Sequence, residues 1–252
     1  MFIDTHCHLT GTYCQNNNLE TTIKNAKDCG VEVLICPTAD PEDIPNAIEI
    51  ANKHDNIFCT IGIHPEHTGV KASDYITKDI LTNPKVIGVG EIGLDYHECA
   101  ETKQEQIKLF EEQLNLAKQY DLPVAIHSRE AEQDTADILG KDSFGVMHCF
   151  TSSWWLAKTM LDRGFYFSAS GIITFKNAEE IRETFKKIPL DRIVIETDAP
   201  YCAPVPYRGK VCEPSMVIET AKVVASIKGL SLEQLEPILM QNTKNLYKKI
   251  VL

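Results

Sequence analysis

The chain has 252 residues, of which 43% are hydrophobic and 24% charged, proportions that indicate a folded globular protein and argue against a disordered one. Its formal net charge of -11 argues against a broad basic surface for nucleic acid, so metal ions and a local basic patch would have to hold such a substrate. No apolar run approaches the roughly 20 residues of a membrane span.

Short apolar runs alternate along the chain with stretches of helical length, which is the pattern of repeated β-α units. The runs that we expect to form strands are Phe2–Thr5, Val31–Cys36, Ile57–Ile63, Val86–Val89, Pro123–Ile126, Phe144–Met147, Phe165–Ala169 and Ile193–Glu196. Their mean spacing is close to the roughly 30 residues of one β-α unit. Eight units in a chain of this length predict an α/β fold of the (β/α)8 TIM barrel type, with one domain over residues 1–252. An open doubly wound sheet is the alternative.

Three of the intervening stretches carry clear helix signals. Leu19, Ile23 and Ala26 mark one helical face before Gly30, and residues 100–120 repeat apolar residues at helical spacing until Pro123 forbids continuation. Ser231 is expected to open the last helix, since serine is a favoured N-terminal cap. No linker, repeat or low-complexity segment interrupts the chain.

Histidine or acidic residues follow six of the eight expected strands. They are His6 and His8 after the first, His64 after the third, Glu91 after the fourth, His127 after the fifth, His148 after the sixth and Asp198 after the eighth. In a barrel the carboxyl ends of all strands meet at one mouth, so these side chains become neighbours. Imidazoles and carboxylates are ligands of divalent metals. The pattern therefore predicts a metal site there, with Cys7 pointing away from His6 and His8 into the packing.

Several longer segments of the chain resemble those of a known family. They are FIDTHCHL at 2–9, IGIHP at 61–65, GEIGLDY at 90–96, IHSR at 126–129, HCF at 148–150, ETDAP at 196–200 and PYRGK at 206–210. Their order and spacing resemble those of the TatD family of metal-dependent hydrolases, within the amidohydrolase-like superfamily.

The resemblance implies a site for two divalent metal ions, which could be Mg²⁺, Mn²⁺ or Zn²⁺. It implies that His6, His8, Glu91 and Asp198 hold one ion and that Glu91 bridges to a second ion held by His127 and His148. The chemistry of Glu91 agrees, because a carboxylate has two oxygens and can link two ions. Asp198 could also orient or deprotonate the attacking water; its alternative is a helix N-terminal cap.

Other residues are expected around this metal set. His64 could orient the scissile phosphate, protonate a leaving group or bind a further ion. Arg129 can offer two parallel hydrogen bonds to a phosphate, and Arg208 lies on a loop after the last strand, where an ordinary solvated charge is an equal alternative. Asp95 is expected to pair with Arg129 or with a ligand histidine.

The two tryptophans are expected at the start of the helix that follows HCF. Trp154 and Trp155 are expected to pack there, and stacking of one of them on a base is the alternative.

Two departures from the family pattern fall near the expected substrate. The family commonly has Asp where this chain has Thr10, and Arg-Asn where it has Val211-Cys212. The second change removes a cation and an amide from the expected substrate loop and leaves the metal set intact. The substrate preference and the strength of phosphate binding can therefore differ from those that the resemblance implies.

The cysteines and the first residues bear on the cellular compartment. The nine cysteines form no Cys-x-x-Cys pair, and their odd number is typical of reduced thiols. The chain opens on Phe2-Ile3-Asp4 without the features of a secretory leader. We therefore expect a cytoplasmic protein that does not contact a membrane.

The resemblance implies a phosphodiesterase, and specifically a deoxyribonuclease. The net charge favours a small metal-focused groove, and hence exonuclease action on single-stranded ends of DNA, over a clamp on long duplex. One alternative keeps the metal site but cleaves an ester or amide, as a D-aminoacyl-tRNA deacylase does. A metal-binding interaction module without turnover is the other. The native metal, the choice between DNA and RNA, the cleavage polarity and the oligomeric state stay open.

Overall fold

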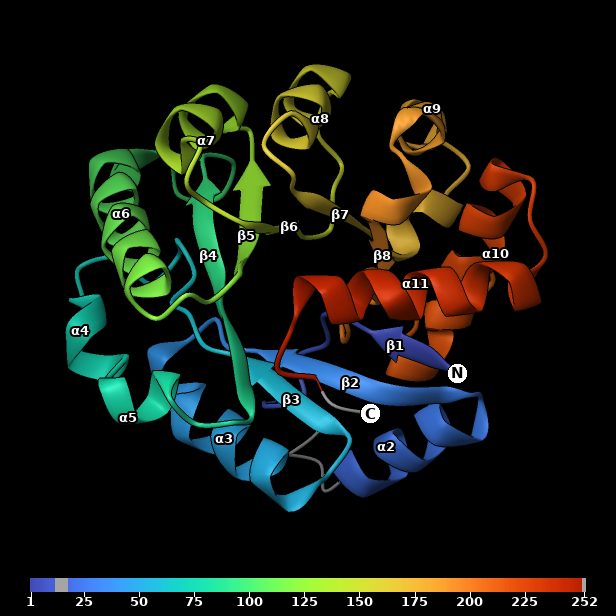
Figure 1. Cartoon of the computed structure of the whole chain (residues 1–252), viewed down its shortest axis with the longest axis horizontal. Helices are drawn as coiled ribbons and strands as arrows, with labels where there is room; N and C mark the ends of the chain where they lie inside the picture. The colour runs from blue at the N-terminus through green and yellow to red at the C-terminus, as the bar shows by residue number, and fades with distance from the viewer. Residues whose placement is uncertain (12–17, 251–252) are drawn as a thin grey trace.

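The computed structural model describes residues 1–11 and 18–250. Its strands are β1 (Phe2–Asp4), β2 (Val31–Pro37), β3 (Ile57–Thr60), β4 (Val86–Asp95), β5 (Val124–Arg129), β6 (Gly145–Met147), β7 (Tyr166–Ala169) and β8 (Ile193–Ile195). All neighbouring pairs are parallel and the order follows the chain from β1 to β8. All eight expected strands are therefore present (Figure 1).

The two edge strands of this sheet meet and nearly close a barrel. The amide of Thr5 donates to the carbonyl of Ile195 at 3.1 Å, and Cys7 forms an isolated parallel bridge with Ala199 just beyond the strand ends. An open doubly wound sheet would leave β1 and β8 apart. The (β/α)8 barrel prediction is therefore confirmed.

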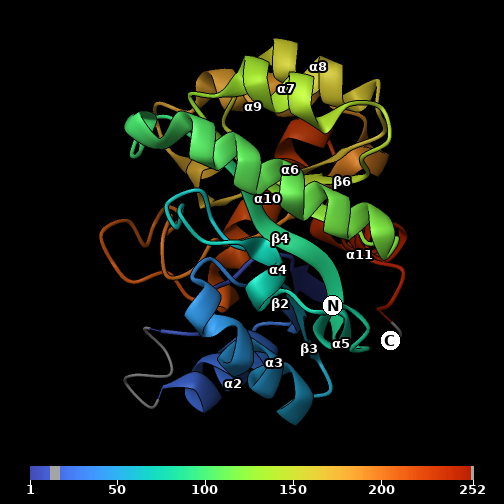
Figure 2. The same cartoon turned by 90° about the vertical axis from the view of Figure 1, so that its left-hand side faces the viewer.

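Helices surround the strands in the described parts of the chain (Figures 1 and 2). The α-helices are α2 (Leu19–Asp28), α3 (Ile44–Lys53), α4 (Ala72–Tyr75), α5 (Lys78–Leu81), α6 (Lys103–Gln119), α7 (Glu132–Leu139), α8 (Trp154–Leu161), α9 (Glu179–Lys187), α10 (Val217–Lys228) and α11 (Leu232–Leu246). Short 3-10 turns are η1 (Pro41–Asp43), η2 (Ala100–Thr102), η3 (Gly171–Thr174), η4 (Leu190–Arg192) and η5 (Pro214–Met216). Across residues 1–11 and 18–250, none of the helices has both the length and the apolar character needed to cross a membrane.

The predicted helix signals fall where the helices lie. The helix expected over residues 100–120 is split into η2 and the long α6. Ser231 caps α11: its side chain accepts from the amide of Gln234, while the Gln234 side chain accepts from the amide of Ser231. This reciprocal pair satisfies two amides that a helix start leaves without partners.

Three strands end three or more residues away from the predicted end. β5 continues past Ile126 to Arg129, so His127 lies within the strand, whereas the prediction placed it after the strand. β3 stops at Thr60 instead of Ile63, because the backbone amide and carbonyl of Ile63 bond instead to the side chain of Gln113 on α6, at 2.8 and 3.0 Å. β4 continues past Val89 to Asp95 and pairs with β5 over this extension. Gly93 makes the pairing possible, since a Cβ there would lie 1.9 Å from the carbonyl oxygen of His127.

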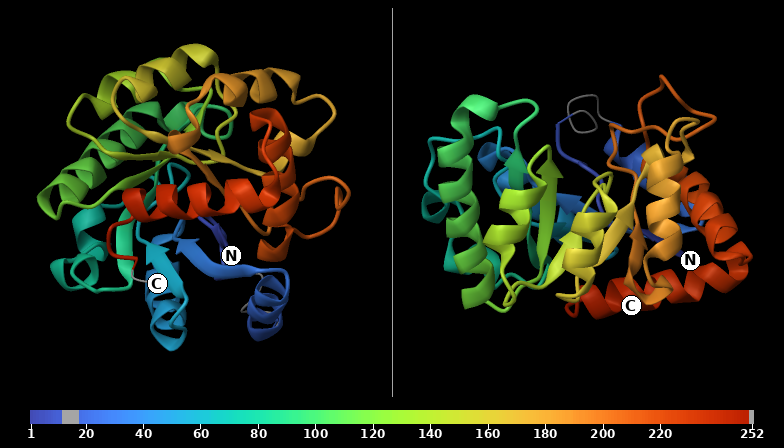
Figure 3. Two further views of the ribbon diagram at one scale, coloured as in Figure 1. Left: turned by 45° about the vertical axis from the view of Figure 1, so that its right-hand side comes forward. Right: turned by 90° about the horizontal axis from the view of Figure 1, so that it is seen from above.

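The apolar core has two parts, because successive strand side chains point to opposite faces. One part lies between the strands and the surrounding helices. The other fills the barrel itself with residues such as Val33, Ile35 and Val194. Leu246 and Tyr247, at the end of α11, join this interior cluster and are fully buried. In the right-hand view of Figure 3, α11 runs beneath the barrel, at the end from which the β4 and β5 arrows point away. The amino-terminal end of the barrel is therefore plugged, and the carboxyl-terminal end is left for a site.

Candidate metal centre

The carboxyl ends of the strands surround a cavity of about 740 Å³. Its lining comes from segments far apart in the sequence: His8, Thr10, Gly11, Ala39, Asp40, Asp43, His64, Glu66, His67, Glu91, Asp95, His127, Ser128, Arg129, His148, Cys149, Thr151, Ile172, Asp198, Pro200, Tyr201 and Cys202. The structure thus brings the expected His and acidic residues to one mouth, as convergence of barrel strands requires.

Glu91 lies at the centre of this cluster and is almost fully buried. Its Oε1 is 2.9 Å from Nδ1 of His127 and 2.8 Å from Nε2 of His148. Its Oε2 is 3.3 Å from Nε2 of His6 and 3.6 Å from Nε2 of His8. Nε2 of His64 also lies 3.5 Å from Oε1. The two carboxylate oxygens therefore face different histidines, an arrangement that a carboxylate linking two ions would need.

The position of Glu91 follows from an irregularity in β4. The pairing with β5 shifts register between Val89 and Ile92. At this point the amide of Glu91 donates to the carbonyl of Thr38 at 2.9 Å instead of joining the β4–β5 ladder. The prediction placed Glu91 after the fourth strand, whereas it lies within β4 at this interruption.

Asp198 faces the His6 and His8 side of the cluster. Its Oδ1 lies 3.8 Å from Nε2 of His6 and 3.6 Å from Nε2 of His8. Asp198 has φ of 60°, and no helix begins at the following residues. Its alternative role as a helix N-terminal cap is therefore wrong.

Two of the histidines are held from behind by carboxylates. Nε2 of His127 is 3.0 Å from Oδ2 of Asp95, and Nδ1 of His148 is 3.1 Å from Oε1 of Glu196. Each ring then presents its other nitrogen to Glu91. Carboxylates in this position fix the ring orientation and tautomer of metal-binding histidines. Of the two partners considered for Asp95, the structure selects the histidine.

Glu196 and Asp4 are buried carboxylates that the sequence analysis missed. Asp4 accepts from the amide of Thr197 at 3.0 Å and from the amide of His6 at 3.3 Å, so it joins the first and last strand ends. Alternation offered a signal for Glu196, because residues two apart on an extended segment share a face and Asp198 was already a candidate. Asp4 lay hidden in an apolar strand pattern.

The pKa values in the cluster are set by burial and by the opposite charges of neighbouring carboxylates and histidines. Burial opposes ionisation of Glu91, but the neighbouring histidines outweigh it and hold its pKa well below the usual range. Burial likewise opposes the charged form of His127 and His148, but contacts with carboxylates raise the pKa of both rings. Burial is the largest influence on Asp4, and it raises the pKa of this carboxyl to about 8 although hydrogen bonds from Thr197 and His6 act in the opposite direction.

His64 differs from the other histidines. Burial is the largest influence on it and lowers its pKa to about 3, so the ring is neutral. Its Nδ1 accepts from the amide of Glu66 at 3.3 Å, which leaves the proton on Nε2, 3.5 Å from Oε1 of Glu91. His64 is also close enough to Glu91 and His127 to form a group of possible metal ligands.

The expected phosphate-binding cations are placed unequally. Arg129 lines the cavity and its Nη1 donates to Oε1 of Glu98 at 2.9 Å. Arg208 is outside the lining, and its guanidinium stacks 3.7 Å from the ring centre of Phe175.

The tryptophans begin α8, as expected, and neither lines the cavity. Lys187 places its Nζ over the ring of Trp154, 5.2 Å from the ring centre. Trp155 is 47% exposed. A base stacked on either ring would therefore lie outside the cavity.

The two departures from the family pattern differ in position, since Thr10 is in the described lining of the cavity and Val211 and Cys212 are not. The hydroxyl of Thr10 donates to Oδ2 of Asp43 at 3.0 Å. Val211 is 57% exposed, whereas Cys212 is buried.

The donor set fits divalent metal ions. Nε2 of His6 is buried, has no hydrogen-bond partner and points toward Glu91 and Asp198. An unpaired buried nitrogen is costly, and a metal ion would remove that cost. His6, His8 and Asp198 also offer three ligand atoms within 4.8 Å of one another. These residues therefore have the chemistry and the spacing to hold metal.

Comparisons with known proteins place the chain among metal-dependent hydrolases. The family model described as TatD related DNase matches residues 3–248. The chain is 38% identical over 258 residues to the Uncharacterized metal-dependent hydrolase YabD of Bacillus subtilis, covering 98% of this chain and 99% of that protein. Among solved structures, the YjjV TatD homolog of Escherichia coli superposes with a TM-score of 0.86 at 28% identity, covering 98% of each chain. A TatD family hydrolase of Entamoeba histolytica gives 0.87 at 27%, covering 99% of this chain and 98% of that one.

Proposed function

Because the chain belongs to the TatD family of metal-dependent hydrolases, we propose that it is a deoxyribonuclease that removes nucleotides from single-stranded ends of DNA. The observation that carries the proposal is the position of Glu91, whose two carboxylate oxygens face different histidines. This geometry supports two divalent ions with Glu91 between them. The description of the matching family model as a DNase supports the phosphodiester bond as the target.

The proposed ligand set is His6, His8, Glu91 and Asp198 for one ion, and Glu91, His127 and His148 for the other. Such a pair supplies positive charge that stabilises a phosphoryl transition state and makes water acidic enough to act as a nucleophile near neutral pH. The protein's part is to hold the pair in place. Asp95 and Glu196 do so by fixing the rings of His127 and His148.

Asp198 is the proposed base for the attacking water. Burial opposes its ionisation, but the hydrogen bond with His8 and the charge of neighbouring histidines outweigh burial and lower its pKa. Asp198 is therefore a carboxylate at neutral pH and can accept a proton at an oxygen that faces the cavity.

His64 and Arg129 are the proposed contacts to the substrate phosphate. The neutral ring of His64 carries its proton on Nε2 and can donate it in a hydrogen bond, which favours phosphate orientation over proton donation to a leaving group. Arg129 would have to exchange its bond with Glu98 for the phosphate. Arg208 would need to leave Phe175 to take part, and we propose only an outer contact for it.

The charge of the cavity supports a strand end as the substrate. Six acidic residues line it, Asp40, Asp43, Glu66, Glu91, Asp95 and Asp198, against Arg129 as the one arginine or lysine in the described lining. Four added positive charges from two ions would make a small region attractive to phosphate, while the surrounding acids repel a long polyanion. A clamp on duplex DNA would need a basic track instead.

The test compares two Asp→Asn variants on end-labelled single-stranded DNA with Mg²⁺ or Mn²⁺. Asp198→Asn should lose at least about 100-fold in kcat, the scale that a general base contributes. Asp121→Asn is the control, because Asp121 is an exposed aspartate with positive φ, which asparagine tolerates. Full activity of purified, folded Asp198→Asn would refute the proposal, as would the absence of any metal-dependent cleavage by the unmodified chain.

Cleavage of a carboxylic ester is the second candidate, because this bond is uncharged and does not need cations in the lining to hold it. With Arg129 bonded to Glu98 and Arg208 stacked away, few groups are ready to hold a phosphate. Parallel assays of the metal-loaded protein on D-aminoacyl-tRNA and single-stranded DNA decide between the two. Deacylation that exceeds DNA cleavage in kcat/KM by 100-fold or more would replace the first candidate by the second.

A further inference from the structure

Two cysteines lie on the side of Asp198 that faces away from the histidines. Sγ of Cys202 is 3.5 Å from Oδ2 of Asp198, whereas Oδ1 of the same carboxylate faces His6 and His8. Sγ of Cys149, Sγ of Cys202 and a carboxylate oxygen of Asp198 all lie within 4.8 Å of one another. Asp198 thus presents one oxygen to each of two groups of ligand atoms.

The spacing of the thiol group is close to that of a metal site. Zinc binds sulfur at about 2.3 Å and carboxylate oxygen at about 2.1 Å, so in a tetrahedral site these two ligands are separated by roughly 3.6 Å. The Cys202–Asp198 separation of 3.5 Å needs almost no adjustment to match this value. Sγ of Cys149 donates to Oγ of Ser170 at 3.1 Å, and this hydroxyl is a further oxygen at the edge of the group.

The backbone directs the three side chains toward one another. Cys149, Asp198 and Cys202 have φ of 41°, 60° and 55°, values that few residues other than glycine adopt. Each of them follows a strand end, and two of the local hydrogen bonds hold the turns: the amide of Cys149 donates to Glu196 at 2.7 Å, and the amide of Tyr201 to the carbonyl of Asp198 at 2.8 Å. The backbone at the carboxyl-terminal end of the barrel therefore fixes the positions of these three side chains.

We propose that Cys149, Cys202 and Asp198 form a separate cation site that takes a thiophilic divalent ion, Zn²⁺ or Cd²⁺. On binding, each thiol releases its proton to solvent and no redox change occurs. Thiolates select such ions over Mg²⁺ and Mn²⁺, so the site differs in metal preference from the His and Glu centre. All three residues line the open cavity, which gives an ion a path to them.

The positions of the three ligand atoms suit a cation. Sγ of Cys202 lies 3.5 Å from an oxygen of Asp198, and Sγ of Cys149 is within 4.8 Å of both residues' ligand atoms. Metals bind thiolates, so a bound cation would displace the thiol protons and offset the negative charge gathered beside Asp198.

The test titrates the reductant-free protein with CdCl₂ under nitrogen, in excess MgCl₂, and follows the ultraviolet thiolate-to-cadmium charge-transfer band. Only thiolate-bound cadmium produces this band, so binding to histidines does not register in it. We expect saturation at one thiolate-bound Cd²⁺ per chain. Cys202→Ser and Cys149→Ser should each weaken the titration at least about tenfold.

The control is Cys29→Ser, since Cys29 is an exposed cysteine outside the cavity. It should retain the wild-type titration. Circular dichroism checks the fold of each variant, and Cys202→Ser alone decides if Cys149→Ser does not fold. No band in the wild-type protein, or an unchanged band in folded Cys202→Ser, would overturn the proposal. The test reports metal coordination, so its result is independent of which bond the protein hydrolyses.

Discussion

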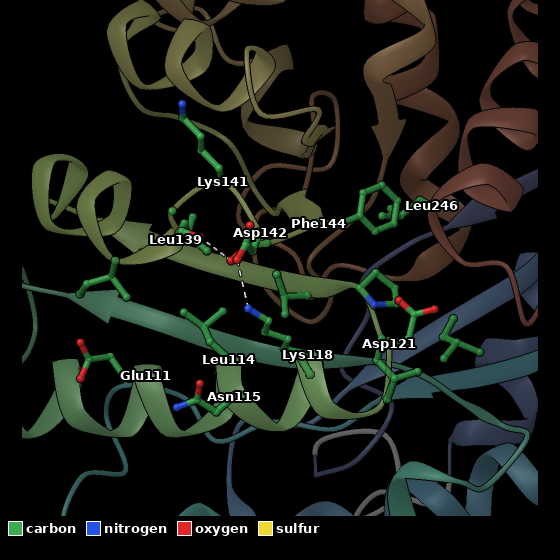
Figure 4. Close-up of a pocket in the computed structure, with 18 of the residues that line it drawn as sticks. Glu111, Leu114, Asn115, Lys118, Asp121, Leu139, Lys141, Asp142, Phe144 and Leu246 are labelled. Carbon is green, nitrogen blue, oxygen red and sulfur yellow. Dashed lines mark hydrogen bonds and ion pairs between the residues drawn. The ribbon is translucent and has the colours of Figure 1, made fainter.

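The two ends of the barrel each have a cavity with charged side chains, but these side chains are mostly exposed at one end and include buried carboxylates at the other. At the amino-terminal end a cavity of about 520 Å³ is lined by parts of α6 and α7 and by the end of the chain (Figure 4). Its acids and its lysines are exposed, except the half-buried Lys249. Lys118 pairs with Asp142 at 3.0 Å. At the carboxyl-terminal end the acids Glu91 and Glu196 are buried and face histidines.

This difference indicates which cavity has side chains suited to catalysis. Exposed ion pairs add little and carry little cost, because water screens them. Buried ionisable groups are costly unless partners compensate them, and such groups cluster at functional sites. The buried cluster therefore marks the candidate site, and the larger of the two cavities lies at the same end.

The largest expected effect comes from replacing one glutamate at each end. Glu91→Gln should reduce hydrolysis at least about 1000-fold, equivalent to roughly 4 kcal/mol, because an amide cannot link two cations as a carboxylate does. Glu111→Gln, in the opposite cavity, should retain wild-type kcat and metal content. Steady-state kinetics and elemental analysis measure both variants. Equal loss in the two would remove the distinction between the ends.

The plug at the amino-terminal end should affect stability without affecting the site. Leu246 is fully buried in the barrel interior, so Leu246→Ala should lower the free energy of unfolding by about 2–5 kcal/mol through lost burial and a cavity. The Mn²⁺ affinity of the folded protein should not change. Urea unfolding and Mn²⁺ titration at low temperature test the two parts, and a tenfold loss of affinity would contradict the separation.

The carboxylates that bond to the metal-facing histidines should affect the affinity of the site for metal. Asp95→Asn leaves Nε2 of His127 without its carboxylate, and should weaken Mn²⁺ binding by about 10- to 100-fold. Asp142→Asn removes the exposed partner of Lys118 at the other end and should leave binding unchanged. Calorimetric titration compares them. Identical affinities in the two variants would assign Asp95 no part in positioning the ring.

The smallest effect expected is a pH dependence confined to the carboxyl-terminal end. The pKa values of His8, His127 and His148 are raised above the ordinary value of 6.5 in the metal-free protein, because carboxylate contacts outweigh burial. A metal ion must displace these protons, so Mn²⁺ affinity should rise as pH increases from 6 to 8. Titrations in two buffers of different ionisation enthalpy should show proton release. Affinity that is flat or falls over this range would contradict the assignment.

Much of the fold was readable because strand burial leaves a strong local signal. A strand covered on both faces must be apolar along its length. Eight such strands at regular spacing in one chain are compatible with only a few sheet topologies. The meeting of His6, Glu91 and Asp198 followed from the same topology, because parallel barrel strands end at one mouth. These inferences needed no knowledge of side-chain contacts.

Other features depended on contacts between residues distant in the sequence. β4 extends to Asp95 because Gly93 allows close approach to the His127 backbone, and nothing local marks that pairing. Arg208 stacks on Phe175, although its position in the sequence suggested a contact with the substrate.

The sequence by itself determined the barrel and the types of ligand brought to its mouth, since local apolar pattern and strand order are enough for both. Only the tertiary structure decided which atoms face one another. It turns the two oxygens of Glu91 toward different histidines, and those of Asp198 toward histidines on one side and the Cys202 thiol on the other. The physical reason is that these orientations come from turns, register shifts and burial across the whole barrel, which no stretch of sequence encodes alone.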